Sequence, residues 1–180
     1  MRKKVLVIPV AIAALVAVLF VAFAPTATAK DFTILEFNTM VGVPRPYTGA
    51  TNAIRGVPGG GLPWVIGSGE GELKANGKLE IRVTGLVLDP SDPTVIASGR
   101  AGTNPIPNFK AIVSCLSKDA SGNATTVNVS TGLFPASTTG NASIEATVAL
   151  PKPCIAPIVF VTSPPSTSAP IGAWFASTGF

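Results

Sequence analysis

The feature that most constrains the fold is the spacing of chain-breaking residues along the sequence. Between residues 30 and 180 the apolar runs are short, and Gly, Pro, Ser, Thr or Asn interrupts each of them. Windows of eleven or more residues do not keep a helical apolar period without such an interruption or a cluster of β-branched residues. This pattern argues against long helices and is typical of antiparallel β-sheet proteins.

The same pattern predicts eight or nine short strands with frequent turns between them. We therefore expect an all-β fold, an antiparallel β-sandwich that is Ig-like in general shape. The segments that predict strands are 32–38, 64–75, 78–88, 94–98, 109–117, 125–130, 142–150, 155–162 and 171–178.

The clearest local signal is a hairpin around Asn76-Gly77, where apolar and charged residues alternate on both sides. A two-residue turn would place apolar residues opposite charged ones on one face, so a three-residue loop fits better. A loop over 75–77 makes Leu73 face Leu79 and gives Gly77 the left-handed position. A loop over 76–78 would instead make Glu72 face Arg82. Turn chemistry favours the first of these two registers.

The N-terminal segment predicts export. Three basic residues precede a 20-residue apolar run over 5–24, and Ala27-Thr28-Ala29 provides a small-x-small cleavage site. We expect a bacterial-type signal peptide over 1–29 and one secreted domain over 30–180, located outside the cell or at its surface. The alternative is an uncleaved membrane anchor, since about 20 apolar residues can span a bilayer.

Subtracting the signal peptide changes what the charge implies. Arg2, Lys3 and Lys4 leave with it, so ten basic and nine acidic residues remain and the net charge falls from +4 to +1. The remaining chain gives no reason to expect nucleic acid or a membrane as a partner. Two cysteines in an exported chain predict one disulfide, between Cys115 and Cys154.

The absence of histidine limits the chemistry available to the chain. It removes Ser-His-Asp and Cys-His catalysis and the commonest transition-metal ligand, so we expect no enzyme, no metal site and no cofactor. A carboxylate-dependent glycoside hydrolase is the alternative, because that reaction needs only two acids. The acidic candidates are Glu70, Glu72, Glu80 and Glu145.

Two further motifs have structural interpretations. Asp89 and Asp92 each precede proline, which predicts a turn more readily than a calcium site. Gly59-Gly60-Gly61 lacks the Lys-Ser/Thr of a phosphate-binding loop and indicates a flexible or tight turn.

The segment 42–63 is the strongest candidate for a binding loop. It is long and aperiodic for a compact domain. An aromatic side chain beside arginines can stack on a sugar or dock a protein. Alternatively, Tyr47 fastens the loop over an open end of the sandwich. The candidate binding residues are Arg45, Tyr47, Asn52, Arg55 and Trp64.

Several stretches resemble a family of small exported bacterial proteins that has no known activity. They are Met40–Pro44, Thr48–Trp64, Cys154–Val161 and Gly172–Ala176. The resemblance implies secretion and a shared β domain, without a site to transfer. We therefore expect a secreted, non-enzymatic structural or binding protein whose partner is an extracellular protein or glycan. One alternative is the glycoside hydrolase. The other is an inhibitor of secreted hydrolases that uses a rigid proline-rich loop as bait.

Overall fold

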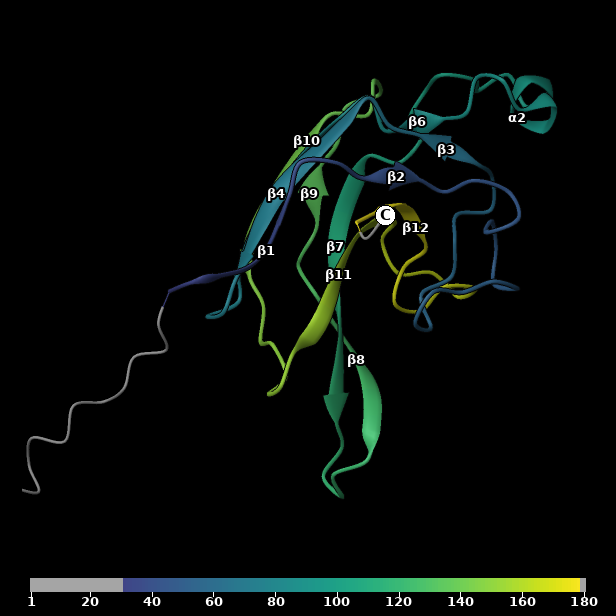
Figure 1. The fold of residues 1–180 in the computed structure, drawn as a ribbon. Coiled ribbons are helices and arrows are strands. Elements are labelled where there is room, and N and C mark those ends of the chain that lie inside the picture. The colour runs from purple at the N-terminus through teal and green to yellow at the C-terminus, as the bar shows by residue number, and fades with distance from the viewer. Residues whose placement is uncertain (1–30, 179–180) are drawn as a thin grey trace, which may run out of the picture.

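The computed structural model describes residues 31–178 and is an antiparallel β-sandwich (Figure 1), which confirms the predicted fold class. The signal peptide predicted over 1–29 lies outside these residues, and the Ig-like shape stays a prediction. The first sheet has the strand order β1 (Thr33–Phe37), β4 (Ser68–Lys74), β5 (Lys78–Thr84) and β10 (Ala142–Thr147).

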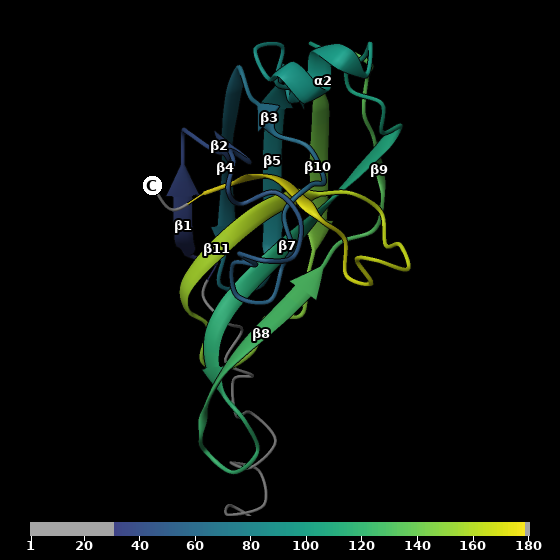
Figure 2. The same cartoon turned by 90° about the vertical axis from the view of Figure 1, so that its right-hand side faces the viewer.

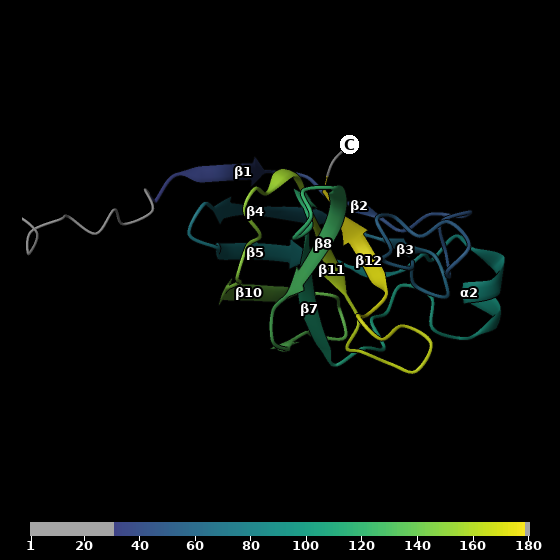
Figure 3. The same cartoon turned by 90° about the horizontal axis from the view of Figure 1, so that it is seen from below.

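The second sheet has the order β2 (Val41–Gly42), β12 (Trp174–Ser177), β11 (Ile155–Thr162), β7 (Asn108–Lys118) and β8 (Ala124–Ser130), and β9 (Phe134–Pro135) also pairs with β7. A small third sheet pairs β3 (Trp64–Val65) with β6 (Val87–Leu88). Seen from below, the strands of the first sheet cross those of the second (Figure 3). Within residues 31–178, no helix is long and apolar enough to cross a membrane.

The core lies between the two sheets, and the alternation of β5 shows how the sequence builds it. Leu79, Ile81 and Val83 are buried, whereas the residues between them carry charge and face solvent. This alternation is expected of a sheet with one packed face and one wet face. The outer face of the first sheet is therefore open.

The second sheet is covered on both faces over part of its length. Its strand β7, between β11 and β8, is buried from Phe109 to Cys115 without alternation. Segment 42–63 contributes to the outer cover: the Arg55 side chain donates to the Ser114 carbonyl of β7 at 3.0 Å, and Gly60 N–H donates to the Trp174 carbonyl of β12 at 2.8 Å. Gly59 is needed there, because a Cβ would clash with the Tyr47 carbonyl.

The predicted β4–β5 hairpin is confirmed in the favoured register. Leu73 lies opposite Leu79, residues 75–77 form the loop, and Gly77 has a φ of +89°. Asn76 stabilises the turn, since its side-chain oxygen accepts from the Lys78 N–H at 2.9 Å. The same register places Glu72 opposite Glu80.

One predicted strand is wrong. Residues 94–98 belong to the short helix α2 (Pro93–Ala97) and its C-cap, because Asp92 caps the helix and Pro93 occupies its first turn. The Asp92 side chain accepts from the N–H groups of Thr94 and Val95, and proline at this position favours a helix start.

Other strand boundaries also differ from the prediction. The segments 64–75 and 78–88 each divide into two strands, near Gly67 and Gly85. The two-residue strands β2 and β9 were not predicted, because neither contains an alternation long enough to recognise.

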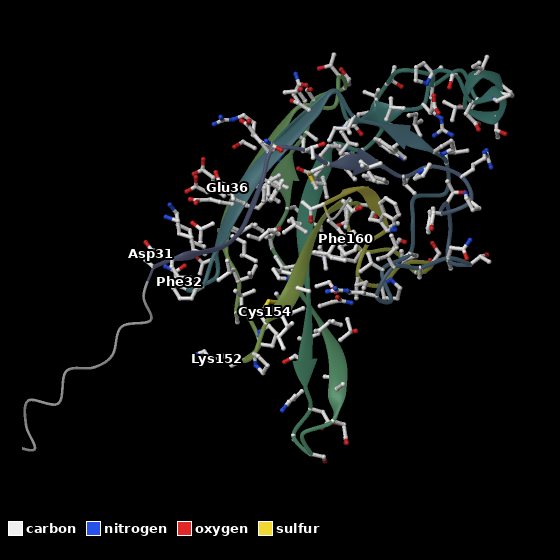
Figure 4. The ribbon with its side chains drawn as sticks, viewed as in Figure 1. Asp31, Phe32, Glu36, Lys152, Cys154 and Phe160 are labelled. Atoms are coloured by element: carbon white, nitrogen blue, oxygen red, sulfur yellow. A yellow bond between two sulfur atoms is a disulfide. The ribbon has the colours of Figure 1, made fainter. Side chains whose placement is uncertain are left out.

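The predicted disulfide is confirmed. Cys115 in β7 and Cys154, immediately before β11, are bonded, with their Cα atoms 4.9 Å apart. Cys154 is labelled in Figure 4, at the lower end of β11. The bond ties two neighbouring strands of the second sheet at the end where β7 continues into the hairpin with β8.

Candidate functional site

The open face of the first sheet carries a groove of about 560 Å³. Its walls come from β1, β4, β5 and β10, so every strand of that sheet contributes to it. The lining combines acidic side chains with Phe37, Asn38, Arg82 and Ser143. Glu36 projects from β1 on the side away from the core (Figure 4).

Four glutamates form one row across this groove. Glu36 lies opposite Glu72, Glu72 opposite Glu80, and Glu80 opposite Glu145. Cross-strand partners have Cβ atoms roughly 4.5–5.5 Å apart and share one face of the sheet. We call these four residues the glutamate row.

In the described part of the chain, the basic residues nearby form ion pairs with the two glutamates in the middle of the row and with Glu70, and not with the glutamates at the two ends of the row. Lys74 Nζ lies 3.5 Å from Glu72 Oε1, and Arg82 Nη1 lies 3.6 Å from Glu70 Oε1. Lys78 forms an ion pair with Glu80. Within residues 31–178, neither Glu36 nor Glu145 forms an ion pair.

The ion pair in the middle of the row shifts the titration of both partners. The hydrogen bond from Lys78 lowers the pKa of Glu80 below its ordinary value, and Glu80 in turn raises the pKa of Lys78. Glu80 is thereby held in its charged form. A general acid needs the opposite shift, since it must keep its proton near neutral pH.

The groove gathers one residue type from the whole sequence. All five glutamates of the 180-residue sequence, the glutamate row and Glu70, line it. Three of the four acidic candidates chosen from the sequence, Glu72, Glu80 and Glu145, lie in the row, and Glu70 lies beside it. Glu36 was not among the candidates, because nothing in the sequence tells which strand pairs with β4 on its other edge.

The predicted binding loop lies elsewhere, against the second sheet and α2. Arg45 makes a two-point contact with Asp92: Nε donates to Oδ2 at 2.7 Å and an Nη donates to Oδ1 at 3.2 Å. This contact raises the pKa of Arg45 and, together with the Val95 and Thr94 N–H groups, lowers the pKa of Asp92 to about 2. Arg45 therefore joins the loop to the N-terminus of α2.

Other members of the predicted set have structural contacts. Arg55 donates to the Ser114 and Ala156 carbonyls, which links β7 and β11, and Asn52 donates to the Pro46 carbonyl within the loop. Trp64 is buried and stacks on Phe175 with ring centroids 4.0 Å apart. The side chains of Arg45 and Tyr47 are 50% and 41% exposed, and Asn52 is exposed as well. Three of the five residues therefore lie at the surface in one loop, whereas Arg55 is half-buried and Trp64 is buried.

The remaining motifs have local roles. Asp89 accepts hydrogen bonds from the Ser91 N–H and hydroxyl, as expected of a turn, and Asp92 caps α2. Within residues 31–178, no group of three or more His, Cys, Asp or Glu side chains is arranged to hold a metal ion.

Comparison with models of protein families, with curated proteins and with solved structures gives no match to this chain. The resemblance to small exported bacterial proteins accordingly stays a prediction.

Proposed function

We propose that the chain is an exported, non-enzymatic binding protein, and that the groove on the first sheet is its ligand surface. The observation that carries this proposal is that all five glutamates of the sequence line one groove. The ligand class that fits is an extended cationic chain, such as a lysine- or arginine-rich segment of an extracellular protein.

The glutamate row supports a binding role because it does not help the fold. Like charges placed directly opposite one another on a sheet destabilise it. The three basic residues beside the row offset part of this repulsion, but among the residues that the structure describes the acids at both ends have no basic partner. A bound cationic chain would supply the missing partners at Glu36 and Glu145.

The shape of the groove suits an extended ligand. The row crosses all four strands of the first sheet, so a chain lying along it would meet one carboxylate per strand. Strands in a sheet are about 4.8 Å apart, so the row spans roughly 14 Å. That length matches about four residues of an extended peptide.

The hydrolase alternative has less support. A glycoside hydrolase needs one carboxyl group with a raised pKa and a second on the other side of the sugar bond. Here the pKa of Glu80 is lowered, and the row lies on one open face. For the inhibitor alternative, segment 42–63 gives less support as a bait loop, because its Arg45 and Arg55 side chains are engaged within the protein.

The test is calorimetric titration of the secreted protein with an oligolysine peptide at low ionic strength. We expect binding that weakens as salt is added, because exposed charges are screened. The double variant Glu36→Gln with Glu145→Gln should reduce affinity at least tenfold and leave the fold unchanged. Its free energy of unfolding should stay equal or rise by up to ~1 kcal/mol, since like-charge repulsion is relieved.

A matched control removes two negative charges outside the groove. Asp89→Asn with Asp119→Asn makes the same change in net charge, and each amide oxygen can still accept the backbone N–H hydrogen bonds of its turn. The control should bind like the wild type. Equal loss of affinity in both double variants, or no binding by the wild type, would refute the proposal.

A further inference from the structure

In the part of the chain that the structure describes, strand β8 ends the second sheet and has one edge without a partner strand. The spatial order of that sheet stops at β8, which pairs only with β7. Figures 1 and 2 both show the β7–β8 hairpin projecting beyond the other strands. The far edge of β8 is therefore accessible along its length.

The register tells which backbone groups face the open edge. Asp119 N–H donates to the Asn123 carbonyl and Thr131 N–H donates to the Ala111 carbonyl, which fixes the alternation of hydrogen-bonded pairs between the two strands. Odd-numbered residues of β8 therefore bond to β7. The N–H and C=O groups of Ala124, Thr126, Asn128 and Ser130 point outward.

This edge lacks the devices by which proteins prevent strand pairing. Its sequence, Ala-Thr-Thr-Val-Asn-Val-Ser, contains no charge and no proline, and its pairing with β7 has no bulge. The other sheet ends in residues 31–178 are protected: β1 has an irregular register and Glu36, β10 has Glu145, and β2, β3 and β6 are each two residues long. An uncharged, regular seven-residue edge is a template for another strand.

Apolar side chains lie beside the same edge. Leu116 of β7 pairs with Ile155 of β11 on one side and with Thr126 of β8 on the other. Leu116 and Ile155 are 41% and 54% exposed. The cross-strand row Ile155–Leu116–Thr126 thus places exposed apolar side chains next to β8, the last strand of the second sheet.

We infer that the chain self-associates through β8, which pairs antiparallel with β8 of a second copy about a two-fold axis. A register centred on Val127 pairs Thr126 with Asn128 of the second copy and Ala124 with Ser130, so the outward backbone groups of both strands meet. A two-fold interface must be self-complementary in this way, and because β8 carries no charged side chain, no like charges lie opposite one another in this register.

The β7–β8 hairpin is held in place by contacts within one copy of the chain. The Cys115–Cys154 disulfide joins β7 to the start of β11, and Cys115 lies directly opposite Val127, the centre of the proposed pairing. Asn128 is also anchored, since its side chain donates to the Arg55 carbonyl at 3.0 Å. An edge already held in strand conformation loses less entropy on pairing than a mobile one.

The test is sedimentation velocity of the secreted protein over a concentration series. We expect a monomer–dimer equilibrium in the wild type. Thr126→Lys adds a charge to the edge, and Thr126→Pro removes one outward N–H without touching the ladder to β7. Each should weaken dimerisation at least tenfold while the melting temperature stays near that of the wild type.

The matched control is Thr147→Lys, the same substitution on β10, the edge strand of the other sheet. It should dimerise like the wild type. Hydrogen exchange of the wild type gives a second measurement that needs no variant: the amides of Thr126, Asn128 and Ser130 should become protected as concentration rises. A wild type that stays monomeric, a dimer that survives both Thr126 substitutions, or protection absent from these amides would each overturn the inference.

Discussion

At the residue scale, Asp92 shows how one side chain holds two elements. It accepts from the N–H groups that begin α2 and from the Arg45 guanidinium of segment 42–63. Sequence reasoning assigned this aspartate to a turn, because the helix it caps is only five residues long. From these contacts we predict how the free energy of unfolding changes at low pH.

We expect Asp92→Asn to lower the free energy of unfolding at neutral pH. The difference from the wild type should become smaller as the pH is lowered. The folded-state pKa of Asp92 is about 2, below its ordinary 3.8. Its charge therefore stabilises the fold fully above about pH 4, and this contribution is lost as pH falls through about 2. Denaturant titrations over this range should show the gap between wild type and variant closing toward pH 2.

Asp89→Asn serves as the control, since Asp89 accepts only local hydrogen bonds from Ser91. Its stability should remain nearly parallel to that of the wild type over the same pH range. A gap between wild type and Asp92→Asn that stays constant down to pH 2 would contradict the role assigned to the charge.

At the element scale, the β4–β5 hairpin sets the register on which the glutamate row depends. Its loop closes against β10: Val148 N–H donates to the Gly77 carbonyl at 3.0 Å. A side chain at Gly77 would clash with the Val148 carbonyl, and the residue also has a positive φ. The position therefore requires glycine for two separate reasons.

The substitution Gly77→Ala should destabilise the protein more than Gly122→Ala. Gly122, in the β7–β8 turn, also has a positive φ, of +84°, but a Cβ there would meet nothing within 4 Å. Gly122→Ala should thus lose about 1–2 kcal/mol for the left-handed conformation alone. Gly77→Ala should lose ~1–3 kcal/mol more, because the clash must also be relieved. Urea unfolding measures both, and equal losses would contradict the role of the Val148 contact.

The elements also show what the sequence could and could not predict. Register within the hairpin followed from alternation and turn chemistry, so Leu73 opposite Leu79 was predictable. The strands that flank it were predictable as strands but not as neighbours, because pairing between distant segments leaves no mark in a single sequence. Glu36 and Glu145 enter the site only through that pairing. The contacts of segment 42–63 could not be predicted for a related reason: its arginines bind carbonyl and carboxylate groups in segments that lie far along the chain.

At the scale of the whole molecule, an aromatic cluster joins the sheets to the long segment. Phe175 of β12 stacks on Trp64 of β3 and meets Phe109 of β7 edge-on at 5.8 Å. Gly60 packs against both the Phe175 ring and the Trp64 indole nitrogen. Interiors packed this closely adjust little when a large side chain is removed.

Truncation of this cluster should therefore affect the entire fold. We expect Phe175→Ala to lower the unfolding free energy by about 3–5 kcal/mol and to shift tryptophan emission to longer wavelength as Trp64 becomes hydrated. Phe32→Ala removes the same ring from a side chain that is 57% exposed and should change stability by less than ~0.5 kcal/mol. A loss of similar size in both variants would contradict the central position given to Phe175.

The confinement of every glutamate to one face also gives the molecule an electric dipole. Residues 30–180 carry a net charge of only +1, yet on the first sheet the five glutamates outnumber Lys74, Lys78 and Arg82, while Arg100, Lys118 and Lys152 lie on other segments. A field exerts a torque on this separation of charge in addition to its force on the net charge. The protein should therefore approach a charged surface in a preferred orientation, with the groove turned toward positive charge.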